Sequence, residues 1–390
     1  MHIGAVTDSL SAFARTKLDE LESRRLRRRL NPTHRLDGLY LERDGRRLLS
    51  FSCNDYLNLS HHPRVKAAAA QAVDRYGAGA GASRLVTGDH PLLGALEQDL
   101  ADFKAMPAAC LFGSGYLANV GTIPTVVGPG DVIFVDALAH ACIFAGAQLS
   151  GALVQVFAHN DMADLQRRLT LSRGEGRHAL IATDGVFSMD GDIAPLDALS
   201  DLARAHDAWL LVDDAHGLGV LAEGRGTAAL FPEARIDLAM GTLSKALGGY
   251  GAYVCASKDV VDLLKTRARS LVYSTGLPPA SAAAARAALQ IVASNPDLTT
   301  KPLQKARRFT EAAGLPPAQS PIVPVMLGEA QAALDAMARL EAEGFLAVAI
   351  RPPTVPAGAA RLRLAFTAAH PDAEVDRLAD LIRPLLEPCR

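Results

Sequence analysis

Apolar and polar positions follow two different periods along the chain, and together they predict an α/β protein. From about residue 105 to 255, short and continuously apolar runs alternate with helical stretches. The expected strands are Val132–Val135, Ala179–Thr183, Trp209–Val212, Leu238–Met240 and Ala252–Cys255. Because parallel strands are buried on both faces, such runs favour a mostly parallel central sheet. Ligands of these sheets bind beyond the carboxyl ends of the strands.

The pattern changes after an alanine-rich segment, Pro279–Ser294, which predicts a helix that ends before Pro296. Beyond it we expect a smaller α+β domain. Its predicted strands are Ile322–Leu327, Ala347–Ile350 and Arg361–Ala365, and its predicted helices are Ala330–Glu343 and Ala373–Leu386. The 390 residues would make an N-terminal helical segment (1–45), a large domain (46–296) and a small C-terminal domain (297–390).

The N-terminal segment has apolar residues at helical spacing from Leu10 to Leu26, which predicts a helix that buries one side only. Arginines, Arg27 among them, follow this pattern. They form either a solvated basic face or an anion-binding site.

Composition and charge exclude several classes of protein. The net charge is -2, with both signs interspersed, which argues against a nucleic-acid partner. The five cysteines are scattered without a C-x-x-C pair, so we expect no metal site and no disulfide framework, but thiols in a reducing cytoplasm. No stretch reaches the roughly 18 apolar residues that a membrane span needs, so we expect no membrane partner either.

The segment Gly241–Gly251 contains the first candidate for chemistry, Lys245. The lysine follows a predicted strand and is surrounded by small residues that leave room for a planar ligand. A lysine amine is nucleophilic only when neutral, which a confined site can arrange. Taken alone, such a lysine would be an ordinary surface residue.

Val212–His216 ends another apolar strand and suggests which planar ligand is bound. Pyridoxal 5′-phosphate (PLP) needs a carboxylate beside its protonated ring nitrogen, because the charged ring is the electron sink of its chemistry. Asp213 is the candidate carboxylate, and His216 could contact the phenolic oxygen of the cofactor. For the adjacent Asp214, a helix N-cap is the alternative.

Further residues could complete a PLP site. Gly115 and Tyr116 begin a helix whose free N–H groups suit a phosphate, and the hydroxyls of Thr242, Ser274 and Thr275 could assist, although the last two also suit a plain turn.

His140 follows a strand and could stack on the cofactor ring, or it could be a core histidine. Ser188, after the next strand, could hold the phenolic oxygen or orient that histidine.

Across essentially its whole length the chain resembles the α-oxoamine synthases, a family of fold-type I PLP-dependent transferases with an aspartate-aminotransferase-like fold. The matching motifs occur in the family's order at Ser52–Pro63, Gly81–His90, Val212–Gly219 and Gly241–Lys245. The resemblance implies that Lys245 binds the cofactor covalently and carries protons, that Asp213 pairs with the pyridinium, and that His140 stacks on the ring. Ser188 and His216 match phenolic-oxygen contacts, and Gly115, Tyr116 and Thr242 match cofactor-holding positions.

The resemblance also implies substrate contacts and an oligomer. Asn54 and Arg363 match positions that hold the amino-acid carboxylate, although a structural ion pair is the alternative for Arg363. Arg27 and Arg351 match positions near the acyl substrate. The family forms homodimers with sites at the subunit interface, where Ser274 and Thr275 would reach the neighbouring subunit's phosphate.

Within the family, Arg351–Gly358 and Arg361–His370 look most like the members that join L-alanine to a pimeloyl thioester, on coenzyme A or an acyl carrier protein, in biotin synthesis. The alternatives are the condensation of glycine with acetyl-CoA, another long-chain activity of the family, a transaminase, or a non-catalytic PLP-binding scaffold.

Overall fold

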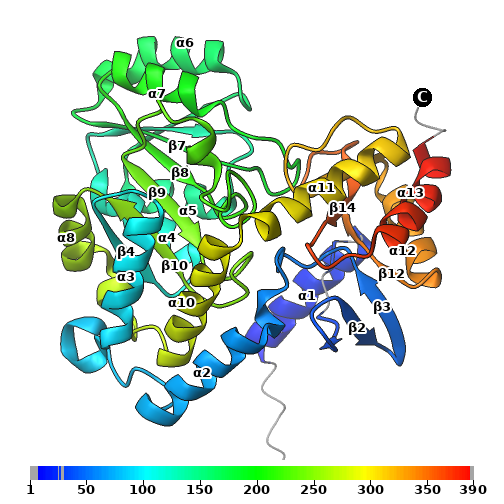
Figure 1. Cartoon of the computed structure of the whole chain (residues 1–390). Helices are drawn as coiled ribbons and strands as arrows, with labels where there is room; N and C mark the ends of the chain where they lie inside the picture. The colour runs from blue at the N-terminus through cyan, green and yellow to red at the C-terminus, as the bar shows by residue number, and fades with distance from the viewer. Residues whose placement is uncertain (1–7, 25, 28–29, 387–390) are drawn as a thin grey trace, which may run out of the picture.

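The computed structural model describes residues 8–24, 26–27 and 30–386. A large α/β part and a smaller part lie side by side, joined by the long helix α11 (Pro296–Ala313) (Figure 1). The large part is built on a seven-stranded sheet of order β4-β10-β9-β8-β7-β5-β6. Its strands are β4 (Ala108–Phe112), β5 (Val132–Asp136), β6 (Leu153–Phe157), β7 (Ala179–Asp184), β8 (Trp209–Asp213), β9 (Leu238–Thr242) and β10 (Ala252–Ala256).

This sheet confirms the predicted mostly parallel architecture. Strands β6, β5, β7, β8 and β9 pair in parallel, and β10 runs antiparallel to both of its neighbours, β9 and β4. The four parallel strands β5, β7, β8 and β9, which carry candidate residues, therefore end at one edge of the sheet. Their side chains, such as Ile133, Leu180 and Leu211, are fully buried, as the continuous apolar runs required.

Helices cover both faces of the sheet and bury its apolar side chains. They are α2 (Pro63–Tyr76), α3 (Pro91–Phe103), α4 (Gly115–Val126), α5 (Ala141–Ser150), α6 (Met162–Ser172), α7 (Leu196–Ala205), α8 (Lys258–Arg267), α9 (Arg269–Val272) and α10 (Pro279–Ser294). Short helical turns occupy Leu59–His61, Arg84–Gly88, Arg173–Glu175 and Thr227–Leu230. The predicted alanine-rich helix is confirmed as α10, and Asn295 breaks the chain before α11 begins at Pro296.

The smaller part contains the antiparallel sheet β11-β14-β13, covered by two helices. Its elements are β11 (Ile322–Gly328), α12 (Ala330–Ala342), β13 (Val348–Ile350), β14 (Ala360–Ala365) and α13 (Asp372–Leu386). The predicted strand over 347–350 is shorter than expected, because the residues before it, β12 (Phe345–Leu346), pair instead with an N-terminal strand.

That N-terminal strand belongs to a second small sheet, β1-β2-β3-β12, formed by β1 (His34–Arg35), β2 (Tyr40–Arg43), β3 (Arg46–Ser50) and β12. Phe51, after β3, packs edge-on against Phe345 and Phe366 at ring-centre distances of 5.7 and 5.4 Å. Residues 34–51 therefore share a core with the C-terminal part. The division into units at 45/46 and 296/297 stays a prediction, and these contacts favour grouping residues 34–51 with the smaller part.

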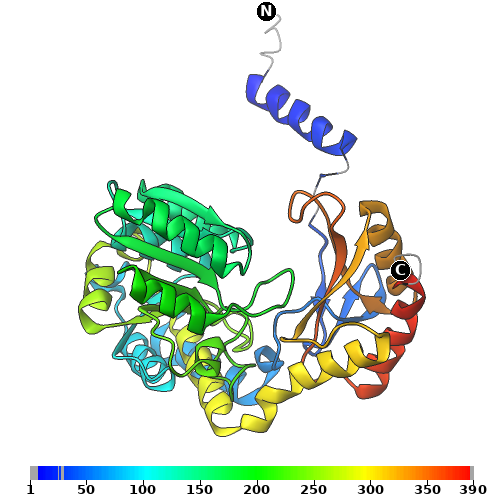
Figure 2. The ribbon, with the colours of Figure 1, turned by 90° about the horizontal axis from the view of Figure 1, so that it is seen from above.

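The helix α1 (Ser9–Ser23) forms as predicted, but the expectation that one side is buried is wrong for the single chain. Leu10 and Phe13 are 73% and 60% exposed, and the helix stands away from both parts of the molecule (Figure 2). Hydrophobic periodicity identifies a helix but not what covers it. Arg25, Arg28 and Arg29 of the adjoining basic segment lie outside the described residues. In the part of the chain that the structure describes, no helix combines the length and apolarity that crossing a membrane requires.

Candidate active site

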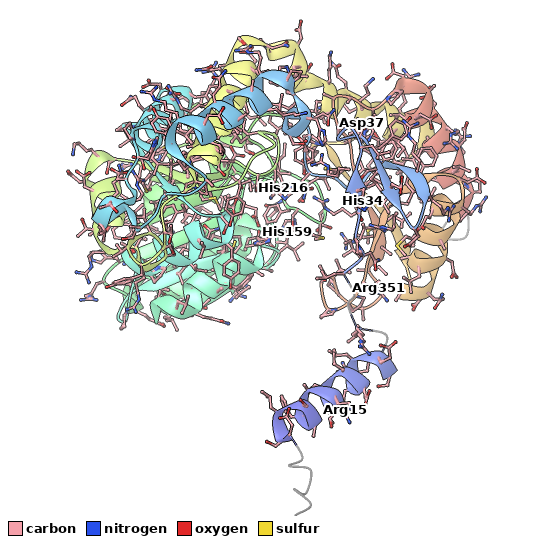
Figure 3. The ribbon with its side chains drawn as sticks, turned by 90° about the horizontal axis from the view of Figure 1, so that it is seen from below. Arg15, His34, Asp37, His159, His216 and Arg351 are labelled. Atoms are coloured by element: carbon pink, nitrogen blue, oxygen red, sulfur yellow. The ribbon has the colours of Figure 1, made fainter. Side chains whose placement is uncertain are left out.

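The carboxyl ends of β5, β7, β8 and β9 converge on one cavity of about 180 Å³. Among the residues that line it are most of the predicted cofactor contacts: Gly115, Tyr116, His140, Ser188, Asp213, His216, Thr242 and Lys245. Each ends a strand of the central sheet or follows one by a few residues, as the position of ligand sites in α/β sheets predicts. In Figure 3, His216 lies on the side of the large part that faces the smaller part.

Lys245 lies three residues beyond β9, with its Nζ 2.6 Å from His216 Nε2. Burial lowers the pKa of Lys245 from 10.5 to about 8, although the nearby carboxylates of Asp213 and Asp184 raise it. A useful fraction of the amine is therefore neutral near pH 7. That is the state in which a lysine attacks an aldehyde.

His216 connects this lysine to a phenol. Its Nδ1 lies 2.6 Å from Tyr56 Oη, and burial lowers the pKa of His216 well below 6.5. The ring is therefore neutral, and when Nε2 accepts a proton of the lysine amine, Nδ1–H donates to Tyr56. Burial also raises the pKa of Tyr56 to about 12, so the phenol keeps its proton. Both side chains can serve as uncharged hydrogen-bond partners in the cavity.

Asp213 ends β8, is 3% exposed and places one of the two carboxylates that line the cavity, the other being that of Asp184. Its oxygens accept hydrogen bonds from Asn119 Nδ2 at 2.8 Å and from the Ala215 backbone at 3.0 Å. Burial raises the pKa of Asp213, which Lys245 and the Asn119 hydrogen bond oppose. A buried carboxylate at a cavity wall suits a protonated pyridine nitrogen, so the residues present fit PLP at this position.

His140 caps the N-terminus of α5. Its backbone N–H donates to Asp184 Oδ2 at 2.7 Å, while its Nδ1 accepts from the Cys142 backbone at 3.3 Å and lies 2.8 Å from Cys142 Sγ. Burial lowers the pKa of His140, with Lys245 in the same direction and Asp213 opposing it. The imidazole is thus held by its Nδ1 edge, and its ring lines the cavity.

The other end of the cavity offers uncharged donors. Gly115 begins α4, whose free N–H groups and positive helix end favour an anion. Thr242 Oγ1 donates to the Gly251 carbonyl at 3.0 Å and lies 2.7 Å from Ser244 Oγ. These groups suit the phosphate of the cofactor.

A second cavity, of about 280 Å³, shares Lys245, His216, His140 and Ser188 with the first and adds Asn54 and Arg363. Both terminal nitrogens of Arg363 donate to Asn54 Oδ1 at 3.2 Å, and its Nε donates to the Ser188 carbonyl. Arg363 is only 8% exposed, and within the described part of the chain it makes no salt bridge. The described residues therefore do not support the alternative of a structural ion pair at Arg363.

The remaining candidates lie elsewhere. Ser274 and Thr275 border a different, small pocket with Arg84, and Thr275 bridges Ser83. Arg27 is on the exposed N-terminal segment, where its Nη1 lies 3.4 Å from Glu22 Oε2. Arg351 follows β13 and lines neither cavity (Figure 3). A single chain does not bring these four residues to the candidate site.

The structure also adds residues that sequence reasoning passed over. Ser244, Cys142 and Asp184 line the first cavity, and Tyr56 and Asn119 contact its members. Ser244 and Tyr56 lie inside motifs that carry the family resemblance, so their position was a usable signal. Asn119 and Cys142 had no such signal, because their contacts depend on how α4 and α5 pack against the sheet.

The chain matches the model of the family "Aminotransferase class I and II" over residues 46–382. An 8-amino-7-oxononanoate synthase of Beijerinckia indica is 60% identical over 380 residues, covering 97% of this chain and 98% of that protein. A Caulobacter vibrioides protein, provisionally given the same name, is 69% identical over 379 residues, covering 97% of this chain and 99% of that one.

Solved structures give the same picture. A serine palmitoyltransferase of Sphingomonas wittichii superposes with a TM-score of 0.90 at 29% identity, covering 98% of both chains. An 8-amino-7-oxononanoate synthase of Francisella tularensis gives 0.76 at 29% identity, covering 87% of this chain and 98% of that one. A related serine palmitoyltransferase structure is described with PLP bound as an internal aldimine. The chain therefore belongs to the 8-amino-7-oxononanoate synthase family of PLP-dependent acyltransferases, within the class I and II aminotransferases.

Proposed function

We propose that this enzyme joins L-alanine to a pimeloyl thioester, carried by coenzyme A or an acyl carrier protein, to form 8-amino-7-oxononanoate for biotin synthesis in the cytoplasm. A carbon–carbon bond forms between the alanine α-carbon and the thioester carbonyl, the carbon–sulfur bond breaks to release the thiol, and the alanine carboxylate leaves as carbon dioxide. The observation that carries the proposal is the buried Arg363, paired with the partly exposed Asn54 beside Lys245, in a cavity adjoining the predicted cofactor site.

The residues of the chain have distinct roles in this proposal. Arg363 and Asn54 bind the amino-acid carboxylate, for which a guanidinium offers two parallel hydrogen bonds. Lys245 takes the α-proton and later returns a proton, since its lowered pKa lets it act as base and acid near neutral pH. When bound, PLP supplies the conjugated pyridinium that withdraws electrons from the α-carbon. Asp213 keeps the ring nitrogen protonated, and His216 and Ser188 lie where they can contact the phenolic oxygen.

The second cavity is also lined by the apolar side chains of Met189, Val348 and Ile350. A row of methylene carbons, as in a pimeloyl chain, can bury apolar surface there. Arg27 and Arg351 stay predicted partners of the far carboxylate of that chain.

We also propose that the enzyme is a homodimer. Large apolar side chains are exposed near the Ser274–Thr275 segment: Tyr273 is 77%, Val86 73% and Leu149 67% exposed. A two-fold interface would cover such side chains. It would also give Ser274 and Thr275 the predicted role at the neighbouring subunit's phosphate.

The test is thiol release by the PLP-loaded enzyme with alanine plus pimeloyl-CoA, compared with glycine plus acetyl-CoA, with the amino ketone identified by mass. We expect the first pair to be strongly preferred and Lys245→Ala to abolish release. Preference for the second pair would overturn the substrate assignment while leaving the reaction class intact. Formation of pyruvate from alanine without thiol release would indicate a transaminase instead.

A further inference from the structure

Asn119 is a fully buried asparagine on α4 that joins two walls of the cofactor cavity. Its Nδ2 donates to Asp213 Oδ2 at 2.8 Å and to Cys142 Sγ at 3.0 Å, which uses both protons of the amide nitrogen. The reversed amide would point its oxygen at the Asp213 carboxylate, and two acceptors would repel. The carboxylate therefore fixes which way this amide points.

Cys142 continues the chain of hydrogen bonds. Its Sγ accepts from Asn119 and lies 2.8 Å from His140 Nδ1, so the thiol proton is available to that nitrogen. Burial raises the pKa of Cys142 to about 12, and the group stays a thiol that can donate. With Nδ1 accepting, the neutral His140 carries its proton on Nε2. The ring is thereby held in one tautomer and one orientation.

We propose that Asn119 and Cys142 are positioning residues, and that Asp213, Asn119, Cys142 and His140 form one hydrogen-bonded unit that fixes the carboxylate and the imidazole around the cofactor ring. The side chains of Asn119 and His140 have no hydrogen bond to each other, and Cys142 Sγ is the hydrogen-bonded link between them. Asp213, which accepts from Asn119, also acts on His140 through its charge. The inference rests on the proposed placement of PLP between Asp213 and His140. It does not depend on which amino acid or thioester is the substrate.

The test is a mutant cycle on the dissociation constant of PLP, measured by cofactor titration of the cofactor-free chain. Asn119→Ala and His140→Ala should each weaken binding by about tenfold or more, because each removes a partner from a buried polar group. Together they should weaken binding by about tenfold less than the product of the single effects, as residues of one network do.

Cys142 provides the decisive comparison. In a Cys142→Ser background the hydroxyl can still accept and donate, and the coupling between Asn119 and His140 should persist. In a Cys142→Ala background the hydrogen-bonded link through the thiol is lost, and the coupling should fall clearly below its native value. Coupling that is equal in both backgrounds, or absent in the native chain, would overturn the proposal. The visible absorption band of the bound cofactor, recorded on the same samples, should also shift non-additively in the native and Cys142→Ser backgrounds and more nearly additively in the Cys142→Ala background.

Two controls distinguish the proposed hydrogen-bonded unit from other causes of weaker PLP binding. Thr122→Val changes another fully buried side chain on α4, whose hydroxyl has no partner in the described structure, and should leave PLP affinity unchanged. If Asn119→Ala does not fold, Asn119→Ser replaces it in the cycle. Asp213→Ala and His140→Ala test the cofactor placement itself, which is wrong if neither change affects PLP binding. Strong single effects of Asn119→Ala and His140→Ala without coupling between them would overturn only the proposed hydrogen-bonded unit.

Discussion

At the scale of single residues, the site depends on keeping ionisable groups in states that water would not favour. Burial shifts the pKa values of Lys245, His216 and Tyr56 in the direction that favours the uncharged form of each. Asp213 provides the compensating negative charge. Because the charge of Asp213 acts on both Lys245 and His140, changes at Asp213 should alter the protonation of these two groups.

The lowered pKa of Lys245 predicts how cofactor uptake depends on pH. The neutral amine is the reactive form, so the rate at which the cofactor-free chain captures PLP should rise with pH, with a midpoint near 8 rather than 10.5. Stopped-flow absorbance over pH 6–11 would measure it. Asp213→Asn removes the charge that raises this pKa and should move the midpoint lower. A midpoint above 10 in the native chain would contradict the burial of the amine.

Arg363 predicts a loss specific to the amino-acid substrate. Arg363→Lys keeps a positive charge but cannot present two parallel N–H groups, so we expect kcat/KM for alanine to fall by about tenfold to a hundredfold. Steady-state thiol release at fixed acyl thioester and varied alanine would measure it. Arg339→Lys, which changes an exposed arginine on α12 outside both cavities, is the matched control for the alanine dependence. Equal effects of the two changes on alanine would argue against a carboxylate site at Arg363.

At the scale of elements, the turn after β8 is held by a buried ion pair. Lys104, just after α3, donates from Nζ to Asp214 Oδ2 at 3.1 Å, and both side chains are almost fully buried. Asp214 also accepts from the backbone and hydroxyl of Thr227. These contacts anchor the turn that presents Asp213 and His216 to the cavity.

Removing one partner of this pair should be costly. Lys104→Met leaves Asp214 buried without its cation, and we expect a loss of about 3–5 kcal/mol in the free energy of unfolding. Urea denaturation of the cofactor-free chain would measure it. Lys258→Met breaks the exposed pair with Asp262 and should change little. The double variant Lys104→Met/Asp214→Asn should recover part of the loss, whereas similar small losses for both lysine variants would refute an anchoring role.

The same elements show what the sequence could predict and why. Strands β5, β7, β8 and β9 were predictable because burial on both faces makes them continuously apolar, and the polar residues at their ends identified most of the cavity lining. The pairing of β3 with β12 joins residues almost 300 positions apart, and no local pattern encodes such a contact. Asn119 and Cys142 escaped prediction for the same reason, since helix packing alone brings them to the site.

At the scale of the whole molecule, two features of the single chain bear on the proposed dimer. The apolar side chains of α1 are exposed, and Ser274 and Thr275 lie away from the cavity of their own chain. The proposed dimer, in which one subunit supplies Ser274 and Thr275 to the other's phosphate, would account for the position of these two residues. A site built from two chains can be tested by mixing two defective subunits. In a mixed dimer, both defects then lie in one site and the other site is native.

A Lys245→Ala subunit paired with a Ser274→Ala/Thr275→Val subunit would contain one fully native site, since the intact Lys245 and the intact hydroxyls would meet there. Random pairing of equal amounts should then restore roughly a quarter of native thiol release, because half the dimers are mixed and each has one native site of two. Pairing Lys245→Ala with Asp213→Ala is the control: both residues line the cavity of one chain, so no native site can form. Restoration in the first mixture alone would establish the shared site. Activity no higher than the mean of the two parents would mean that Ser274 and Thr275 serve their own chain or none.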